Sequence, residues 1–326
     1  MRTAYEEHLP PRDERKIHTP SCEGRQVFYI LRKFDMAVYS KPPLFAPELL
    51  IRLSLRGLNI RNFQKAKKYL NTIGYYRLSA YFSPFQVSHD IFSPGVSFDN
   101  ILSLYIFDRK LRLLFLDPIQ RIEITVRAFM SNHMSLKYGA YWYLESSLFS
   151  NQSFHHNFVS EIYRNAGKTN PHNQAFCKHY FNKYGDNLVP PSWMVIEVLT
   201  MGNWSKLFAH LRHKDQRDIA SYFNFSPKEF GNWLKHVTLI RNSLAHHMRF
   251  WNAEFPFSPN LTKYATLTGP ATGAYSKFVV VLVLLKTIVN KSEWNIRLKE
   301  HIRSCPLDVV QHMSFPVDWE KLPYWN

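Results

Sequence analysis

Three side chains near the end of one predicted helix have the types and spacing for phosphodiester chemistry: Arg241, Asn242 and His246. Residues four apart lie on the same face of a helix, so Asn242 and His246 would be neighbours. The long side chain of Arg241 could reach a phosphate held beside His246. Histidine is the side chain that most often transfers a proton in catalysis, and a cation stabilises the charge that develops on a reacting phosphate. The sequence therefore predicts a catalytic site at these residues.

The sequence around this cluster supports the prediction, since arginine–histidine spacing alone is a weak signal in a chain with 15 histidines. Similar pairs also occur at Arg2/His8, Arg12/His18 and Arg127/His133. The helix that leads to the cluster is expected to begin with a capping box, Ser226 and Glu229, and apolar residues follow at helical spacing. The alternative interpretation is structural, because arginine and histidine also complement the carbonyl end of a helix.

The composition points to a polyanionic partner. The formal net charge is +16 over 326 residues, and the basic residues are spread along the chain. Such a charge favours nucleic acid, although a basic surface can also serve solubility alone. An aromatic content of 16% favours RNA, because unpaired bases stack on exposed rings. We therefore expect RNA as substrate or regulatory partner.

No metal, cofactor or membrane contact is expected. The cysteines Cys22, Cys177 and Cys305 are far apart and show neither a disulfide framework nor paired metal-ligand spacing. The sequence has no glycine-rich phosphate loop or dinucleotide fingerprint. The first residues are charged, which predicts no signal peptide, and the longest apolar run, 278–285, is too short to span a bilayer. We expect a cytoplasmic protein.

The periodicity predicts an all-α helical bundle. Helices are expected at 48–58, 62–73, 98–115, 117–139, 193–211 with a break at Gly202, 227–249, 274–289 and 292–302. We expect a disordered tail over 1–40, with Met36 as an alternative start, an N-terminal helical segment over 41–90, a core over 91–255 with an inserted polar region at 146–190, and a C-terminal helical extension over 256–326.

Further polar residues of the core are candidates for a supporting role: Glu123, Arg127, His133, Glu197 and His247. Glu123 and Arg127 are four apart, which favours a simple ion pair within one helix. The alternatives are that Glu123 orients groups near Arg241, or that Arg127 and His133 form a second site. Glu197 is the one acid in an apolar run, so we expect it to be buried and paired with Arg241 or a histidine, or to form a core ion pair.

Basic and aromatic residues before the core are candidates for RNA binding: Lys67, Lys68, Tyr75, Tyr76 and Arg77, together with Arg249 after the predicted site. Exposed rings would stack on bases, and the cations would contact phosphates. The alternative is that the rings pack on the core.

Five stretches resemble, in order, the abortive-infection proteins of the Abi-like family (AbiD/AbiF type) within the HEPN ribonuclease superfamily. They are KPPLFAPELLIRLSLRGL (41–58), YLNTIGYYRLSAYFSPF (69–85), FDRKLRLLFLDPIQRIEITVRAFMSNHMSLKYGAYWYL (107–144), PPSWMVIEVLTMGNWSKLF (190–208) and RNSLAHHMRFWN (241–252). The resemblance covers about residues 41–255 and implies a HEPN-like helical core formed by the helices around 117–139, 193–211 and 227–249. It also implies that Glu197 lies near the active site.

The resemblance implies a metal-independent endoribonuclease that acts as an anti-phage effector or toxin. His246 would serve as general base on the ribose 2′-hydroxyl or as acid to the leaving 5′-oxygen, Arg241 would neutralise charge, and Asn242 would fix His246 or a phosphate oxygen. It further implies a homodimer and a restraining antitoxin. The rival hypotheses are a non-catalytic RNA-binding scaffold and a protein-interaction module.

Overall fold

Helices make up most of the chain that the computed structural model describes, which confirms the prediction of an all-α protein. The described residues are 42–172, 174–185, 189–259, 261, 273–289 and 292–325. The predicted tail and the alternative start at Met36 lie outside them. The chain divides into two units, Met1–Pro43 and Leu44–Asn326, and everything that follows concerns the second.

The first elements are short helices and a hairpin. In order they are α1 (Ala46–Leu55), α2 (Phe63–Ile73), α3 (Tyr75–Ser79), a 3-10 turn (Ser83–Phe85), β1 (Gln86–Ser88) and β2 (Ile91–Phe92). The strands pair antiparallel in the only sheet of the described residues, which the sequence did not predict. Asn62 caps α2 by accepting from the Lys65 N–H at 2.9 Å. Gly74, with φ at +88°, separates α2 from α3 and so fixes where α3 begins.

The longest element is α4, Phe98–Tyr138, which runs unbroken through the point where the sequence predicted that one helix ends and another begins at Pro118. The predicted break was wrong. A proline lacks the N–H that would bond the carbonyl four residues earlier, here that of Leu114. The indole N–H of Trp294 donates to this carbonyl at 2.7 Å. A distant side chain thus satisfies the group that Pro118 leaves without a partner, and the helix continues.

The polar region after α4 holds two 3-10 turns (Trp142–Leu144 and Ser146–Leu148) and two shorter helices, α5 (Gln152–Ala166) and α6 (Ala175–Lys183). The helix expected over 193–211 is instead two, α7 (Ser192–Val195) and α8 (Met201–His210). The predicted break at Gly202 was wrong by a few residues. Thr200 caps α8 by accepting from the Asn203 N–H at 3.2 Å, so Gly202 lies inside the first turn of α8.

The remaining elements are α9 (His213–Tyr222), α10 (Pro227–Ala245), α11 (Ala274–Ile288), α12 (Trp294–Arg303), α13 (Val309–Met313) and the 3-10 turns Trp319–Lys321 and Pro323–Trp325. The predicted capping box of α10 is present, since the Glu229 N–H donates to the Ser226 hydroxyl at 3.3 Å and the Glu229 carboxylate accepts from the Ser226 N–H at 3.0 Å. The predicted apolar helix α11 is also confirmed, and its side chains are buried from Ala274 to Leu285.

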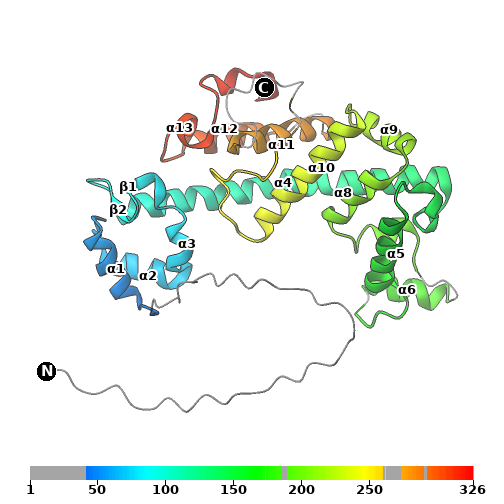
Figure 1. The fold of residues 1–326 in the computed structure, drawn as a ribbon, viewed down its shortest axis with the longest axis horizontal. Helices are drawn as coiled ribbons and strands as arrows, with labels where there is room; N and C mark the ends of the chain where they lie inside the picture. Colours follow the sequence, from blue (N-terminus) through cyan, green and yellow to red (C-terminus); the bar gives the residue numbers. More distant parts are fainter. Residues whose placement is uncertain are drawn as a thin grey trace, which may run out of the picture. The chain divides into compact units, whose positions relative to one another are not determined.

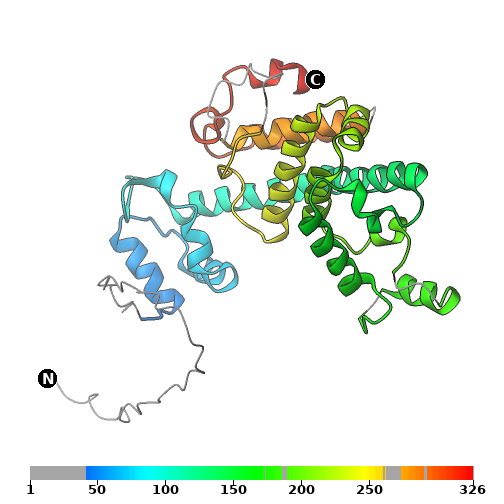
Figure 2. The same cartoon turned by 45° about the vertical axis from the view of Figure 1, so that its right-hand side comes forward.

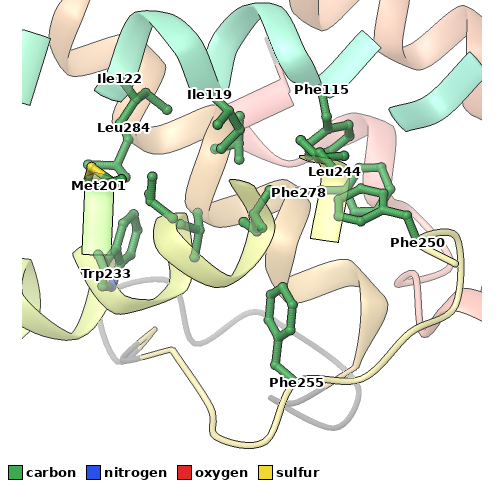
Figure 3. Close-up of a cluster of buried hydrophobic side chains, with 14 of the residues drawn as sticks. Phe115, Ile119, Ile122, Met201, Trp233, Leu244, Phe250, Phe255, Phe278 and Leu284 are labelled. Atoms are coloured by element: carbon green, nitrogen blue, oxygen red, sulfur yellow. The ribbon is translucent and has the colours of Figure 1, made fainter. Parts of the chain in front are cut away.

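The core lies where α4, α10 and α11 meet. Figures 1 and 2 both show α10 crossing α4, with α11 alongside, and α10 packs against α4, α8, α9 and α11. The side chains that fill this contact come from all three helices and from the chain after α10 (Figure 3): Phe115, Ile119, Ile122, Trp233, Leu244, Phe250, Phe278 and Leu284. Close packing of this kind fixes the position of the C-terminal end of α10. None of the described helices is both long and apolar enough to cross a membrane.

Candidate functional site

The predicted catalytic residues lie at the C-terminal end of α10. The helix ends at Ala245, and His246 is the capping residue, whose N–H donates to the Asn242 carbonyl at 3.0 Å. Asn242 and His246 are therefore still one turn apart, although His246 lies just beyond the helix and not within it. Both side chains are exposed. His246 can thus reach a ligand in solvent directly.

His247 ends the helix in a conformation that normally favours glycine, with φ at +54°. Its N–H donates to the Leu244 carbonyl at 3.1 Å, and the next N–H, of Met248, donates to the Ser243 carbonyl at 2.9 Å. These two bonds are those of a Schellman motif, in which glycine usually occupies the left-handed position. A histidine there costs about 1 kcal/mol in backbone strain.

The loop after α10 is held by basic side chains from other helices. Each donates to a different carbonyl group: Arg77 to His247 at 2.6 Å, Arg112 to Met248 at 3.3 Å and Lys277 to Phe250 at 2.8 Å. Lys277 is fully buried on α11, with its ammonium 4.5 Å from the centre of the Phe250 ring. Burial lowers the pKa of Lys277 to about 7.

Asp108 is the acid that completes this anchor. It lies fully buried on α4, and its carboxylate accepts from the Phe250 N–H at 3.2 Å and the Trp251 N–H at 2.7 Å. It also accepts from the Tyr81 hydroxyl at 2.6 Å and pairs with Arg112. Burial raises the pKa of the Asp108 carboxyl, while Arg112 and the hydrogen bonds oppose that shift. Hydrogen-bonding side chains from three helices therefore fix the loop that follows His246.

Arg241 lies beside Glu123 of α4. Its Nε is 3.7 Å from one carboxylate oxygen of Glu123, and Arg127 pairs with the other oxygen. The guanidinium also donates to the Asn242 side-chain oxygen at 3.5 Å, at the limit of a hydrogen bond. Within the described residues, no hydrogen bond or ion pair joins Arg241 to His246. One copy of the chain thus presents the cation and the imidazole separately at the end of α10.

Arg127 and His133 contact different acids. Arg127 pairs with Glu123, whereas the His133 Nε2 is 3.9 Å from the Asp218 carboxylate on α9. His133, Asp215 and Asp218 place their ligand atoms within 4.8 Å of one another, which is a possible metal-ligand group. The ammonium of Lys137 bonds both carboxylates, Asp215 at 2.7 Å and Asp218 at 2.8 Å. Although burial lowers the pKa of Lys137, these bonds raise it overall, so the ammonium already supplies the positive charge that the acids need.

Glu197 is exposed, so the expectation that it is buried was wrong. The apolar run around it suggested a continuous buried helix, but the chain leaves the helix after Val195 and turns Glu197 towards solvent. Among the residues that the structure describes, Glu197 has neither a hydrogen bond nor an ion pair through its side chain. The acid beside Arg241 is instead Glu123, on another helix.

Two hollows lie at the end of α10. The first, the Tyr76 hollow, has a volume of about 400 Å³ and is lined by Tyr76, Arg77, His246, His247 and Arg249 among others. The second, the Arg109 hollow, has a volume of about 500 Å³ and is lined by Arg77, Arg109, Arg112, Leu113, Leu116 and His247 among others. Both volumes fall in the range of small-ligand sites. Arg77 and His247 line both hollows, so the two are adjacent.

The structure separates the predicted RNA-binding residues into two groups. Tyr76, Arg77 and Arg249 line the Tyr76 hollow, whereas Lys67 and Lys68 line neither hollow. The Tyr75 ring packs edge-on against Phe82 with centroids 5.9 Å apart, as the packing alternative proposed.

Sequence reasoning did not select Arg109, Arg112, Asp108 or Lys277. Asp108 comes directly after the apolar residues 104–107 and Lys277 directly before the apolar run 278–285, and this was the signal that could have found them. A buried charge requires a partner, and here the partner is the loop after α10. Arg109 has no such signal, since it is exposed on α4 and gains its place only from the way α4 and α10 cross.

The fold and the site define a helical protein with a basic surface around the end of one buried helix. Residues 68–252 match the model of the Abi-like protein family. Because this match covers more than half of the chain, the chain belongs to the Abi-like family. The matched range includes α4, α10 and the predicted catalytic residues. Comparisons with curated proteins and with solved structures gave no significant match.

Proposed function

We propose that this protein is a metal-independent endoribonuclease of the HEPN type (AbiD/AbiF-like) that acts as an abortive-infection effector or toxin. The observation that carries the proposal is the exposed His246 at the end of α10, beside a hollow lined by Arg77 and Arg249 and one helical turn after Asn242. Membership of the Abi-like family supports the role in defence. The net charge of +16 supports a nucleic-acid substrate.

In the proposed reaction a ribose 2′-hydroxyl attacks the adjacent phosphorus, the bond to the 5′-oxygen breaks, and a 2′,3′-cyclic phosphate remains. His246 takes the proton from the 2′-hydroxyl or gives one to the departing 5′-oxygen. Arg241 neutralises the charge on the phosphorane. Asn242 holds His246 or a phosphate oxygen by a hydrogen bond. Glu123, with Arg127 on its other oxygen, keeps the guanidinium of Arg241 in place.

A homodimer belongs to this proposal. Arg241 and His246 make no direct contact within one chain, so a second copy would supply the missing partner across a shared cleft. A restraining antitoxin, either protein or RNA, would keep such an activity silent until infection. The rigid anchoring of the loop after His246 by Asp108, Arg112 and Lys277 supports a site that must hold its geometry.

The test is the chemistry of the product ends. Purified protein with EDTA is expected to cut single-stranded RNA and to leave 2′,3′-cyclic phosphates, and a strand with 2′-deoxyribose at the cut position is expected to resist. Binding without cutting, in the presence and absence of divalent cations, would favour the alternative of an RNA-binding scaffold. Absence of RNA binding at physiological salt would leave the protein-interaction module.

A further inference from the structure

The two hollows at the end of α10 share Arg77 and His247 as a common wall. We propose that they are two nucleotide subsites, one on each side of the reacting phosphate, and that the substrate is therefore RNA whose bases are unpaired. This inference rests on the proposed function for the position of the cut. The nature of the ligand is argued from the side chains of the hollows.

The Tyr76 hollow has the parts of a base-stacking site. The Tyr76 ring is 92% exposed, so its packing contributes little to the fold, and it lines the same hollow as His246. An exposed tyrosine next to cations offers a flat face for a base and charge for the phosphate that follows it. Arg77 and Arg249 supply those cations, and both are fixed by hydrogen bonds to backbone carbonyl groups, of His247 at 2.6 Å and of Ala80 at 2.7 Å.

The Arg109 hollow combines cations with an apolar wall. Arg112 is committed to Asp108 and to the Met248 carbonyl, whereas Arg109 makes no hydrogen bond or ion pair with any described residue. Its guanidinium is therefore available for a phosphate. Leu113 and Leu116 form part of the wall and are 57% and 41% exposed, so they offer an apolar surface on which a base or a ribose can pack.

The dimensions of the hollows select unpaired RNA over a duplex. Each hollow, of about 400 and 500 Å³, is of a size for one nucleotide and lies in a concave surface. A base inside an A-form duplex is stacked on both faces and paired at its edge, so it cannot enter such a hollow. Two successive unpaired nucleotides can enter the two hollows, and the phosphate between them then lies against His247 and beside His246.

The experiment measures binding of a short mixed-sequence RNA with 2′-O-methyl riboses, which cannot be cut by 2′-hydroxyl attack. The strand is offered alone and in a duplex of the same chemistry, and fluorescence anisotropy gives the affinities. Tyr76→Ala is compared with Phe45→Ala, whose ring is also exposed, at 81%, but lines neither hollow. Arg109→Gln is compared with Arg52→Gln, which removes an equal charge from the exposed surface of α1.

The wild type is expected to bind the single strand at least tenfold more tightly than the duplex, because stacking one base on an aromatic ring contributes about that much to the affinity. Tyr76→Ala is expected to bind the single strand roughly tenfold more weakly than the wild type. It should also no longer quench the fluorescence of a 2-aminopurine base in the strand, because that quenching reports stacking on the ring. Phe45→Ala should retain both the affinity and the quenching. Arg109→Gln is expected to lose several-fold more affinity for the single strand than Arg52→Gln. All four side chains are exposed, so the variants keep the fold, which circular dichroism checks.

Equal affinity for strand and duplex, or variants that behave as their controls, would overturn the subsites. Cleavage of unmodified RNA is followed in parallel so that the two proposals fail separately. If the wild type cuts RNA but Tyr76→Ala binds RNA as tightly as Phe45→Ala, the subsites are refuted and the nuclease proposal stands. If binding depends on Tyr76 and Arg109 but no RNA is cut, the subsites stand and the nuclease proposal is refuted.

Discussion

Replacing Asp108 by alanine should destabilise the protein far more than replacing any exposed acid of the same helix. The carboxylate of Asp108 accepts from two backbone N–H groups of the loop after His246 and pairs with Arg112, which is itself 6% exposed. Removing one partner of a buried ion pair costs about 3–5 kcal/mol because the other charge stays buried. Each backbone donor left unsatisfied adds about 1–3 kcal/mol, although these costs do not add fully.

The expected loss is therefore about 5 kcal/mol, a large share of the roughly 5–15 kcal/mol by which proteins are stable. For a unit of this size it corresponds to a fall of roughly 10–20 °C in melting temperature. Asp99→Ala is the matched control, because Asp99 is also on α4 and also pairs with a cation, Lys65 at 2.6 Å, but its side chain is 42% exposed. Its loss should cost about 1 kcal/mol or less.

Thermal and urea unfolding followed by circular dichroism measure both variants. Asp108→Asn should fall between them, since it keeps an oxygen for the backbone donors and loses the charge that faces Arg112. If Asp108→Ala unfolded as late as Asp99→Ala, the loop would not depend on the buried carboxylate. The account of how His246 is positioned would then be wrong.

Three further variants test other contacts. His247→Gly should raise the free energy of unfolding measured in urea by about 1 kcal/mol, since glycine accepts φ at +54°. It should also weaken RNA binding, because His247 lines both hollows. A variant less stable than the wild type would show that the backbone at His247 is not strained. Burial lowers the pKa of Lys277 from 10.5 to about 7, so between these values the folded state holds fewer protons than the unfolded state and stability rises with pH by up to about 1.4 kcal/mol per unit. Lys277→Met should remove this rise. If the free energy of unfolding changed equally with pH in both proteins from pH 7 to 10, the lowered pKa of Lys277 would be refuted. Glu123→Gln should release Arg127 and Arg241 and lower the rate of RNA cleavage roughly tenfold to hundredfold with a smaller effect on KM, and an unchanged rate would show that Glu123 does not orient Arg241.

Local sequence signals predicted the elements that depend on local chemistry. The capping box at Ser226 and the apolar run of α11 gave correct helices, because a cap and a buried face act within a few residues. The course of α4 through Pro118 could not be predicted, since the missing hydrogen bond is replaced by Trp294, far along the chain. The same holds for Glu197, which faces solvent because of where α7 ends.

In the candidate site, too, some features follow from the local sequence and others depend on packing between distant residues. The chemistry proposed for Arg241, Asn242 and His246 rests on their types and spacing, and the sequence also suggested that Glu123 lies near Arg241, as the structure has it. The groups that hold the loop come from three helices brought together by packing, so no spacing in the sequence relates Asp108 or Lys277 to His246. The hollows arise in the same way, since the Arg109 hollow is lined by residues of α4 and α10 together with Arg77, and the Tyr76 hollow by residues around α3 and by the loop after α10.

The most direct test of the central claim is cleavage of end-labelled RNA in EDTA by the wild type, His246→Ala and Arg241→Ala. His89→Ala serves as the control, because the His89 side chain is 95% exposed in the hairpin and lines neither hollow. The account predicts that the wild type and His89→Ala cut equally and that the other two variants lose at least about a hundredfold. Equal cutting by all four proteins, or cutting by the wild type that stops in EDTA, would contradict it.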